Sequence, residues 1–379
     1  MRYNKDNLKG ACLMNKTGFG FLRLPRLNAE DETSIDFSVV EQMVDRYLEL
    51  GGTYFDTAYT YLGGASEKGI RRCLTQRYPR ERYRLADKLP GWKLTSYGQC
   101  RECFNEQLER CGVEWFDVYL IHWLNADNYA VCEKHDQFRF LRELKAGGKA
   151  KAIGFSYHDG PELLEEILTR HHEVDYVQLQ INYLDWDSPA LQARRCYEVA
   201  VKHGKKVIVM EPVKGGTLAQ LPPEAEARLR ALRPTDSMAA WAVRFASSLE
   251  HVEVMLSGMS TVEQVEDNLR PLEPLSDSER EVLAGVADLL RAETAIPCTA
   301  CNYCAPNCPM KIAIPQYFAL YNDYARKPAE GWKMGHAYQS LARTFGKASA
   351  CITCRACERN CPQKLPITDH LKSVAKAFE

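Results

Sequence analysis

The stretch Cys298-Thr-Ala-Cys301-Asn-Tyr-Cys304-Ala-Pro-Asn-Cys308-Pro309 decides the fold of the last part of the chain. Its spacing, C-x2-C-x2-C-x3-C-P, occurs again from Cys351 to Pro362. Four thiolates held close together by tight turns can surround a cubane of iron and sulfide, and the proline stops a helix from continuing through the last ligand. The two runs therefore predict two 4Fe-4S clusters.

The two runs resemble those of two-cluster ferredoxins, in which the fourth cysteine of each run binds the other cluster. The resemblance implies that Cys298, Cys301, Cys304 and Cys361 hold one cluster, called cluster 1 below, and that Cys351, Cys354, Cys357 and Cys308 hold cluster 2. Structural zinc is the alternative. Zinc sites, however, usually pair two C-x2-C knuckles without the further cysteines and the proline.

The other seven cysteines show no ligand spacing apart from Cys100-x2-Cys103, and they are Cys12, Cys73, Cys100, Cys103, Cys111, Cys132 and Cys196. The Cys100 pair lies in an amphipathic stretch, residues 97–111, where packing into a helix core is expected. We predict that all seven are structural thiols. A chain with so many free thiols and two oxidisable clusters is expected in a reducing compartment.

Composition excludes several classes of function. The net charge of −1 over 379 residues favours neither nucleic acid nor an anionic membrane as a partner. Neither a signal-peptide pattern nor an uninterrupted run of 18 apolar residues is present, so a soluble cytoplasmic protein without a membrane partner is expected.

Eight short apolar runs alternate with amphipathic segments over the first 270 residues or so. The expected strands are residues 18–24, 53–56, 83–88, 117–122, 150–156, 176–180, 206–211 and 252–257. Eight strand–helix units of this size are typical of a parallel (β/α)8 TIM barrel. A doubly wound sheet usually has fewer strands and a glycine-rich first turn, and no G-x-G-x-x-G follows any expected strand.

A polar stretch punctuated by prolines, Arg270-Pro-Leu-Glu-Pro-Leu-Ser276, follows the last strand and helix. We expect a barrel at residues 1–275, a linker helix at 276–294 and a dicluster domain at 295–379. The 42 residues between Cys308 and Cys351 show helical spacing and carry many aromatics. They predict a small, mainly α-helical ferredoxin-like domain.

Titratable side chains end three of the expected strands. Asp56 ends the second strand, Lys88 the third and His122 the fourth, and Tyr61 lies five residues after Asp56. Active residues of such barrels gather at the C-terminal ends of the strands. Each residue alone has an ordinary structural explanation, such as a helix cap or a buried imidazole. Together at one rim they indicate a catalytic site.

The sequence around these residues resembles the aldo-keto reductases over roughly residues 10–270. The resemblance is carried by Asp56-Thr-Ala-Tyr-Thr-Tyr61-Leu-Gly-Gly-Ala-Ser66-Glu67, Ala86-Asp-Lys88, Leu120-Ile-His122-Trp123 and Gly154-Phe-Ser156. It implies a barrel that uses NADP or NAD, without metal or flavin, to interconvert a small carbonyl compound and its alcohol. Asp56, Tyr61, Lys88 and His122 are then the catalytic residues.

The chemistry of this set follows from the residue types. Tyr61 has an ordinary pKa of about 10, so we expect Lys88 to lower that pKa while Asp56 keeps Lys88 protonated. Tyr61 then acts as the proton donor to the carbonyl oxygen, and His122 orients the same oxygen.

The resemblance also implies the residues that bind the cofactor, which are Ser156, Gln178, Met210, Pro212, Lys214, Gly215, Gly258, Gln264 and Asn268. Ser156 and Gln178 are expected at the nicotinamide carboxamide. The glycines and lysine of residues 211–218 are expected around the pyrophosphate, and residues 258–268 at the adenosine end.

Three positions depart from the family pattern. Tyr157 stands where relatives commonly have Asn, and Met210 stands where many have a Tyr that stacks on the nicotinamide. The segment from Ser257 to Gln264 holds no Lys or Arg for a 2′-phosphate. Because such a phosphate needs charge-assisted hydrogen bonds, we expect a weak preference between the cofactors or one tilted towards NADH.

Two functions are compatible with both domains. A nicotinamide moves two electrons as hydride whereas a cluster moves one, so direct exchange normally requires a flavin, and no flavin motif is visible. We expect a carbonyl reductase whose clusters serve electron transfer, docking or structure, with a ferredoxin or another redox protein as a candidate partner. The alternative is a nicotinamide-sensing electron-transfer subunit of a larger redox complex. Trp92, Trp186 and residues 123–130 suggest an aromatic-walled pocket for the substrate.

Protein isolated without oxygen should contain about eight iron and eight sulfide per chain, because each cysteine run contributes ligands to a cubane cluster. Metal and sulfide analysis, with paramagnetic resonance of the reduced protein, measures this. Stoichiometric zinc in place of iron, or the signal of a single cluster, would contradict the prediction.

Overall fold

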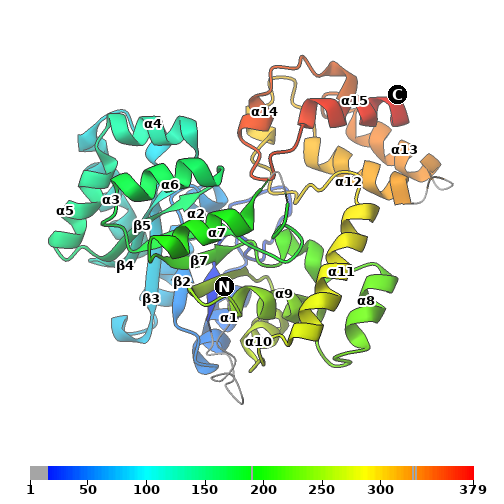
Figure 1. The fold of residues 1–379 in the computed structure, drawn as a ribbon. Helices are drawn as coiled ribbons and strands as arrows, with labels where there is room; N and C mark the ends of the chain where they lie inside the picture. The colour runs from blue at the N-terminus through cyan, green and yellow to red at the C-terminus, as the bar shows by residue number, and fades with distance from the viewer. Residues whose placement is uncertain (1–15, 189–190, 327, 329–330) are drawn as a thin grey trace.

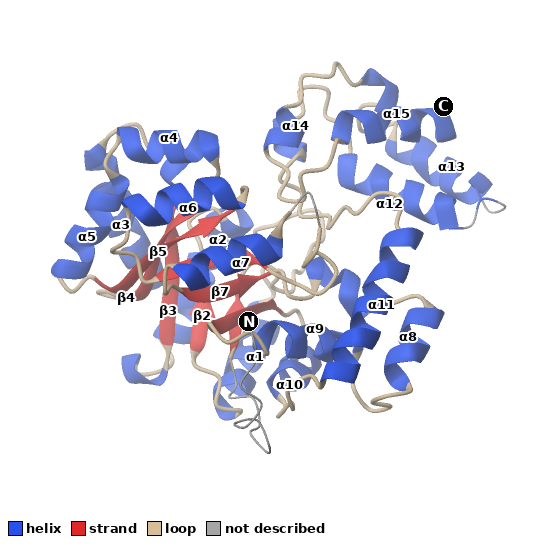
Figure 2. Ribbon diagram, viewed as in Figure 1, coloured by secondary structure: helices blue, strands red, loops and turns tan. Residues whose placement is uncertain are grey.

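The computed structural model describes residues 16–188, 191–326, 328 and 331–379. Eight parallel strands form a closed barrel in chain order, and helices surround it (Figures 1 and 2). The strands are β1 (Thr17–Gly20), β2 (Tyr54–Asp56), β3 (Arg84–Leu89), β4 (Phe116–Leu124), β5 (Ala150–Tyr157), β6 (Tyr176–Gln180), β7 (Lys206–Met210) and β8 (Val252–Gly258). The predicted (β/α)8 barrel is confirmed.

Fifteen α-helices occur among the described residues. Those packed with the barrel are α1 (Phe37–Glu49), α2 (Ala65–Ile70), α3 (Tyr97–Cys111), α4 (Ala126–Lys134), α5 (Gln137–Ala146), α6 (Pro161–Arg170), α7 (Ala193–Lys202), α8 (Pro223–Arg230), α9 (Met238–Ser247), α10 (Val262–Leu269) and α11 (Asp277–Glu293). The cluster domain contains α12 (Ile314–Arg326), α13 (Gly331–Leu341), α14 (Ala356–Arg359) and α15 (Ile367–Phe378). None of the described helices is long and apolar enough to span a bilayer.

Polar residues start several of the barrel helices. A side-chain oxygen of Asp36, Ser96, Asn125, Ser237 or Thr261 accepts a hydrogen bond from a backbone N–H in the first turn of the helix that follows. Each cap satisfies a donor that the helix itself cannot, and is worth about 1 kcal/mol. These caps fix where each strand-to-helix loop ends.

The interior of the barrel below the mouth is filled by a cluster of mostly apolar side chains. This cluster consists of Tyr54, Ala86, Val118, Leu120, Tyr176, Ile208, Val254 and Leu256. Since successive side chains of a strand alternate between its faces, the residue two positions after Tyr54, Ala86, Leu120, Tyr176 or Ile208 also points inward, one level higher. Asp56, Lys88, His122, Gln178 and Met210 all occupy such positions, so the strands deliver them to the barrel mouth.

The first strand is shorter than predicted. The sequence suggested residues 18–24, whereas β1 ends at Gly20 and the N–H of Phe21 donates to the Asp56 carbonyl. The chain then leaves the sheet, and the Arg23 side chain lies against Gly258. β7 likewise ends at Met210, before the predicted Glu211, which has a left-handed backbone with φ of 54°.

The cluster domain has a hydrophobic core separate from that of the barrel. This core contains Ile296, Cys304, Ile312, Ala313, Ile314, Tyr317, Phe318, Tyr338, Ala348, Cys357, Leu365, Ile367, Leu371 and Val374. In Figure 1 the helices α12 to α15 stand beside the barrel, and α11 leads to them. The predicted mainly α-helical ferredoxin-like domain is confirmed.

The segment predicted as a linker, residues 276–294, contains α11. Its side chains Leu283, Val286, Ala287 and Leu290 belong to the hydrophobic core of the barrel. Fully burying such a leucine or valine contributes about 1.5–3 kcal/mol. The helix therefore anchors the cluster domain to the barrel rather than spacing the two apart.

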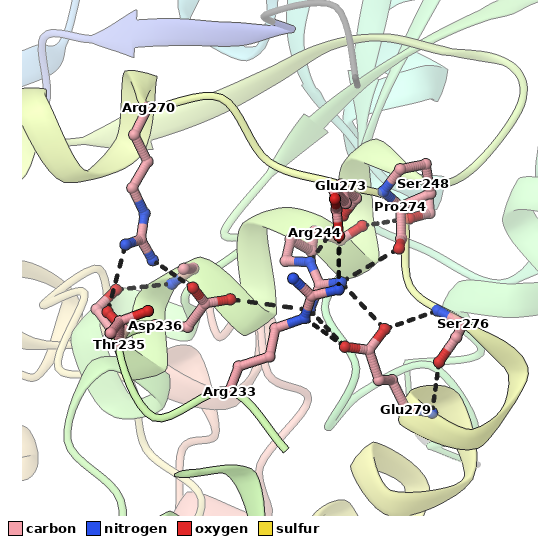
Figure 3. A network of polar contacts seen from close by, with 12 residues as sticks. Arg233, Thr235, Asp236, Arg244, Ser248, Arg270, Glu273, Pro274, Ser276 and Glu279 are labelled. Atoms are coloured by element: carbon pink, nitrogen blue, oxygen red, sulfur yellow. Dashed lines mark hydrogen bonds and ion pairs between the residues drawn. The ribbon is translucent and has the colours of Figure 1, made fainter. Parts of the chain in front are cut away.

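A buried arginine fixes the start of α11 (Figure 3). The Arg244 guanidinium, fully buried on α9, donates to the carbonyls of Glu273 (2.7 Å) and Pro274 (3.1 Å) and to Glu279 Oε2 (3.0 Å). Glu279 also closes a capping box with Ser276, the N-cap of α11. One charged network thus holds the turn and the helix together.

Two further charges complete this network (Figure 3). Arg233 pairs with Glu279, and Asp236 lies 3.9 Å from Arg244. Burial alone would raise the pKa of Glu279, but hydrogen bonds from Arg233 and Arg244 outweigh it and lower the pKa to about 2. The stability that Glu279 contributes is therefore present above its ordinary pKa of about 4.3 and is lost as the pH falls towards 2.

The cysteines outside the two runs lie where the sequence suggested. The six described ones, Cys73, Cys100, Cys103, Cys111, Cys132 and Cys196, are all buried and free. Cys12 lies outside the described residues. Burial raises the pKa of Cys100 to about 11, which keeps it a thiol at neutral pH.

Arg244→Met should lower the free energy of unfolding by about 3–5 kcal/mol, because it removes a buried charge partner of Glu279 and leaves the carbonyls of Glu273 and Pro274 without their donor. Denaturant unfolding followed by circular dichroism measures this. Arg46→Met, which removes an exposed pair with Glu266, is the matched control and should cost about 0–1 kcal/mol. A loss below about 1 kcal/mol in Arg244→Met would contradict the role given to the network.

Candidate active site and cluster sites

A buried ion pair lies at the mouth of the barrel. Lys88 Nζ donates to Asp56 Oδ1 at 2.5 Å and to the Thr57 carbonyl at 2.8 Å. Burial raises the pKa of Asp56, and the attraction of Lys88 opposes that rise. Because both side chains are almost wholly buried, the pair fixes the ammonium at one point of the mouth.

Tyr61 lies directly beside this ammonium. It begins a short 3-10 turn after β2, and Lys88 Nζ lies 4.8 Å from the centroid of its ring. The Tyr61 ring also meets the imidazole of His122 edge to face, with 5.6 Å between centroids. The structure thus brings together all four residues that the sequence predicts to be catalytic.

The pKa of Tyr61 differs from the sequence prediction. Burial raises this pKa well above its ordinary value, and the carboxylates of Asp56, Asp87 and Glu211 add to the rise. The net lowering of the Tyr61 pKa that the sequence suggested is therefore not found, because burial and these carboxylates outweigh the neighbouring ammonium. Tyr61 keeps its proton at neutral pH, as a proton donor must.

His122 is held as a neutral imidazole. Burial lowers its pKa well below the ordinary value, and the charges of Lys88 and His158 act in the same direction. Its Nδ1 is buried and finds no hydrogen-bond partner among the described residues. A neutral imidazole has one donor and one acceptor nitrogen, so His122 can hydrogen-bond an uncharged carbonyl oxygen without a change of charge.

Tryptophans wall the same region. The Trp92 ring meets those of His122 and Trp123, each with 5.4 Å between centroids. Trp123 has an unusual positive φ of 60°, and its N–H donates to Ser156 Oγ at 2.7 Å. Trp186, which the sequence also suggested for the pocket, instead packs against Tyr197 and Phe245.

Two buried side-chain amide oxygens, one on β6 and one on α10, lack hydrogen-bond partners among the described residues. Gln178 Oε1 and Asn268 Oδ1 accept no hydrogen bond from any described residue. Leaving such an acceptor unsatisfied costs about 1–3 kcal/mol, so a ligand that donates hydrogen bonds fits both places. Ser156 lies next to Gln178 in register, and its hydroxyl proton is free because the oxygen accepts from Trp123. These groups match an amide-bearing ligand.

Lys214 fixes the loop after β7 through hydrogen bonds to residues outside that loop. Lys214 is buried, and its Nζ donates to Asp185 Oδ1 and Oδ2, at 2.7 and 2.6 Å, and to Gln363 Oε1 at 2.8 Å. The sequence suggested that this lysine contacts a pyrophosphate. The structure instead gives it an internal role, which keeps Met210, Pro212 and Gly215 of the same segment in place.

Arg23 lies against two of the glycines expected around the cofactor. A Cβ placed on Gly215 would come within 3.0 Å of Arg23 Nη2, and one on Gly258 would meet the Arg23 stem at 3.1 Å. Both glycines are therefore needed to leave room for this side chain. Gln264 is exposed, and its Oε1 accepts from the Ser260 N–H at 2.7 Å.

Each set of four cysteines lines its own cavity in the cluster domain. One cavity is lined by the cluster 1 cysteines Cys298, Cys301, Cys304 and Cys361, and the other by the cluster 2 cysteines Cys308, Cys351, Cys354 and Cys357. This is the crossed grouping that the sequence suggested.

The two cysteine runs share one backbone conformation. Positive φ angles occur at Ala300, Asn302 and Lys311 in the first run and at the equivalent Thr353, Arg355 and Lys364 in the second. Such turns direct backbone N–H groups inward, where they favour a negatively charged group. The Ala300 N–H, for example, donates to Cys298 Sγ at 3.5 Å.

The loops around cluster 1 sit on the barrel mouth. Gln363, two residues after Cys361, donates from Nε2 to Glu211 Oε2 at 3.0 Å while its Oε1 accepts from Lys214. The carbonyl of Thr299, one residue after Cys298, packs so closely on Gly215 that a Cβ there would lie 2.9 Å away. Cluster 1 is therefore the cluster next to the candidate active site.

A closed barrel with this tetrad at its mouth agrees with a match in sequence. Residues 18–287 match the profile of the aldo/keto reductase family. The chain belongs to the aldo/keto reductase family. Residues 297–365 match a 4Fe-4S dicluster domain, so this aldo/keto reductase carries iron–sulfur clusters in its C-terminal domain.

Its relatives are distant. An aldo-keto reductase from Mycolicibacterium paratuberculosis is 25% identical over 252 residues, which are 65% of this chain and 81% of that protein. A 9,11-endoperoxide prostaglandin H2 reductase from Trypanosoma cruzi is 26% identical over 200 residues, 52% of this chain and less than two thirds (64%) of that protein.

Solved structures of aldo-keto reductases share the fold. The holo form of one from Bacillus halodurans is 24% identical and has a TM-score of 0.58, covering 72% of this chain and 91% of that one. One from Klebsiella pneumoniae in complex with NADPH is 18% identical and has a TM-score of 0.56, covering 72% of this chain and 90% of that one.

Sequence reasoning missed Arg23, Tyr303 and Gln363 in this reductase. Arg23 was placed inside the first strand, and only the early end of β1 frees it for the rim. Tyr303 and Gln363 lie among cluster ligands, and nothing in the sequence indicates that their loops contact the barrel. The only sequence feature that could have indicated these two residues is their position beside the cluster ligands Cys304 and Cys361.

Cys361→Ser should damage cluster 1 and spare cluster 2. The reason is that Cys361 is a ligand of cluster 1, whose other ligands lie about 60 residues earlier in the chain, and serine replaces its thiolate with a hydroxyl. Paramagnetic resonance of the reduced protein distinguishes the two. Cys308→Ser is the matched control and should damage cluster 2 instead. Loss of cluster 2 in Cys361→Ser would overturn the pairing.

Proposed function

We propose that the barrel interconverts an aldehyde or ketone and its alcohol with NAD(P)H as the second substrate. The gathering of Asp56, Lys88, Tyr61 and His122 at one mouth carries this proposal, because the ion pair, the phenol ring and the imidazole lie in contact there. The family assignment supports the same chemistry.

Tyr61 is the general acid in this mechanism. Its raised pKa keeps the proton on the phenol until negative charge develops on the carbonyl oxygen, and the proton then moves from the Tyr61 hydroxyl to that oxygen. Lys88, 4.8 Å from the ring centroid, stabilises the resulting phenolate. Asp56 holds the ammonium in place for that step.

His122 positions the carbonyl and stabilises the charge that develops on its oxygen. Because its pKa is lowered, it does so as a neutral hydrogen-bond donor and does not compete with Tyr61 as the acid. Trp92 and Trp123 exclude water around this oxygen, which strengthens both interactions.

The cofactor, when bound, supplies a hydride. We propose that the Ser156 hydroxyl and the unpartnered Gln178 oxygen hold its carboxamide, that the unpartnered oxygen of Asn268 lies at the adenosine end, and that Arg23 contacts its phosphates. The NADPH complex of the Klebsiella pneumoniae relative supports a nicotinamide cofactor. Since Arg23 is a cation outside residues 257–264, it weakens the expectation of a preference for NADH.

The clusters link the barrel to an external electron carrier in this proposal. All residues lining the cluster 2 cavity belong to the cluster domain, and Cys354 and Ile352 beside it are exposed. A redox protein such as a ferredoxin is therefore the partner we propose at cluster 2. The alternative, a nicotinamide-sensing subunit of a redox complex, would keep cofactor binding without carbonyl turnover.

Tyr61→Phe should lower kcat for a simple aldehyde by about 10²–10⁴, because only the phenolic proton is removed. Affinity for the reduced cofactor, titrated by intrinsic fluorescence, should stay within about twofold since Tyr61 is not among the cofactor contacts. Tyr59→Phe, which removes a hydroxyl bonded to Glu106, is the matched control and should retain activity.

Lys88→Met should be similarly inactive, and the double variant should be no worse than either single variant because both changes remove one acid. Retention of more than about a tenth of the wild-type kcat in Tyr61→Phe, against the loss expected of a general acid, would refute this mechanism. No turnover in the wild-type protein despite tight cofactor binding would favour the sensing subunit.

A further inference from the structure

Tyr303 lies inside the ligand run of cluster 1. It follows Cys301 by two residues and precedes Cys304, so two bonds to one cluster flank it. Asn302 beside it has the left-handed φ of 65° that the turn requires. The bonds of Cys301 and Cys304 to cluster 1 therefore restrict the backbone position of Tyr303.

The Tyr303 side chain leaves the cluster domain and reaches the barrel. Its ring stacks on that of Trp123, with centroids 5.4 Å apart and planes inclined by 30°. Trp123 directly follows His122 and meets Trp92 edge to face. Tyr303 thus extends the aromatic wall that begins beside the imidazole.

Trp123 and Trp92 connect Tyr303 to the catalytic residues. The Trp92 ring meets that of His122 with 5.4 Å between centroids, and the Trp123 ring contacts both Trp92 and Tyr303. Tyr303, from a cluster ligand run, therefore belongs to the same group of aromatic rings as the catalytic imidazole.

We propose that Tyr303 forms one wall of the carbonyl-binding pocket and that cluster 1 holds this wall in position. The inference rests on the proposed function of the barrel and adds a substrate-selecting residue to it. A flat aromatic aldehyde would pack against the group of rings that includes Tyr303 and Trp92, whereas a short aliphatic aldehyde would contact Tyr303 little.

The link to cluster 1 follows from how the wall is held. Bonds from Cys301 and Cys304 to cluster 1 would fix the shape of the Tyr303 loop, and the Thr299 carbonyl of the same run lies against Gly215 of the barrel. An error of about 1 Å in a substrate-positioning group is enough to impair a reaction. Loss of cluster 1 should therefore act on the pocket as loss of the Tyr303 ring does. Cluster 2, which lies next to residues of its own domain, should have no such effect.

Steady-state kinetics of Tyr303→Ala with benzaldehyde and propanal tests the wall. We expect KM for benzaldehyde to rise about tenfold, as loss of an aromatic contact predicts, and KM for propanal to change by less than about twofold. The change should appear in KM rather than kcat. Tyr303→Phe keeps the ring and should restore most of the affinity for benzaldehyde. The matched control is Phe345→Ala, which removes an exposed ring of the cluster domain.

Binding without turnover gives a second readout. Calorimetric titration of NADP⁺-loaded protein with benzamide should show a Kd about tenfold higher in both Tyr303→Ala and Cys361→Ser than in wild type, but an unchanged Kd in Cys308→Ser. Iron content and cluster absorbance of Tyr303→Ala should equal those of wild type.

An equal rise in KM for both aldehydes in Tyr303→Ala, or an effect confined to kcat, would contradict the proposal that Tyr303 forms a wall of the pocket. Wild-type affinity for benzamide in Cys361→Ser would overturn the role of cluster 1. If wild-type protein reduced neither aldehyde, the proposed reaction would fail, while the benzamide titration would still decide whether Tyr303 lines the pocket.

Discussion

Closure of the sheet between β1 and β8 is the constraint on which the site depends. Gly20 pairs with Asp56 on one side and with Gly258 on the other, so the first and last strands share one rim. The period of two along each strand then places charged and polar groups above an apolar layer. The ion pair between Asp56 and Lys88 is stable there because each buried charge has its partner within hydrogen-bond distance.

The second constraint is the crossed ligation of the clusters. Cys361 completes cluster 1 from a loop that also carries Gln363, and Gln363 bonds both Glu211 and Lys214 of the loop after β7. The first cysteine run contributes the Thr299 carbonyl against Gly215. Both parts of the cluster 1 ligand set therefore contact the loop after β7, so the cluster domain is packed directly against the mouth of the barrel.

Much of this arrangement could be read from the sequence, and what could not has physical causes. The positions of Asp56, Lys88 and His122 at the ends of expected strands predicted that they meet at one rim. Cysteine spacing predicted two clusters, and the resemblance to two-cluster ferredoxins implied the crossed grouping of their ligands. Spacing carries no information on desolvation, which raises the pKa of Tyr61 where a neighbouring ammonium alone would lower it. It also carries none on docking between domains, which alone gives Tyr303 its place on Trp123. Arg23 was hidden because an apolar run does not reveal where a strand leaves the sheet.

The order of the two domains along the chain has a consequence for biosynthesis. The last barrel strand, β8, ends at Gly258, whereas the last ligand of cluster 1 is Cys361. Domains generally fold in the order in which the ribosome delivers them, so the barrel can close while Cys361 is still absent. On the functions proposed above, the catalytic residues would then be in place before the Tyr303 wall and the Gln363 contacts, and assembly of cluster 1 would complete the pocket.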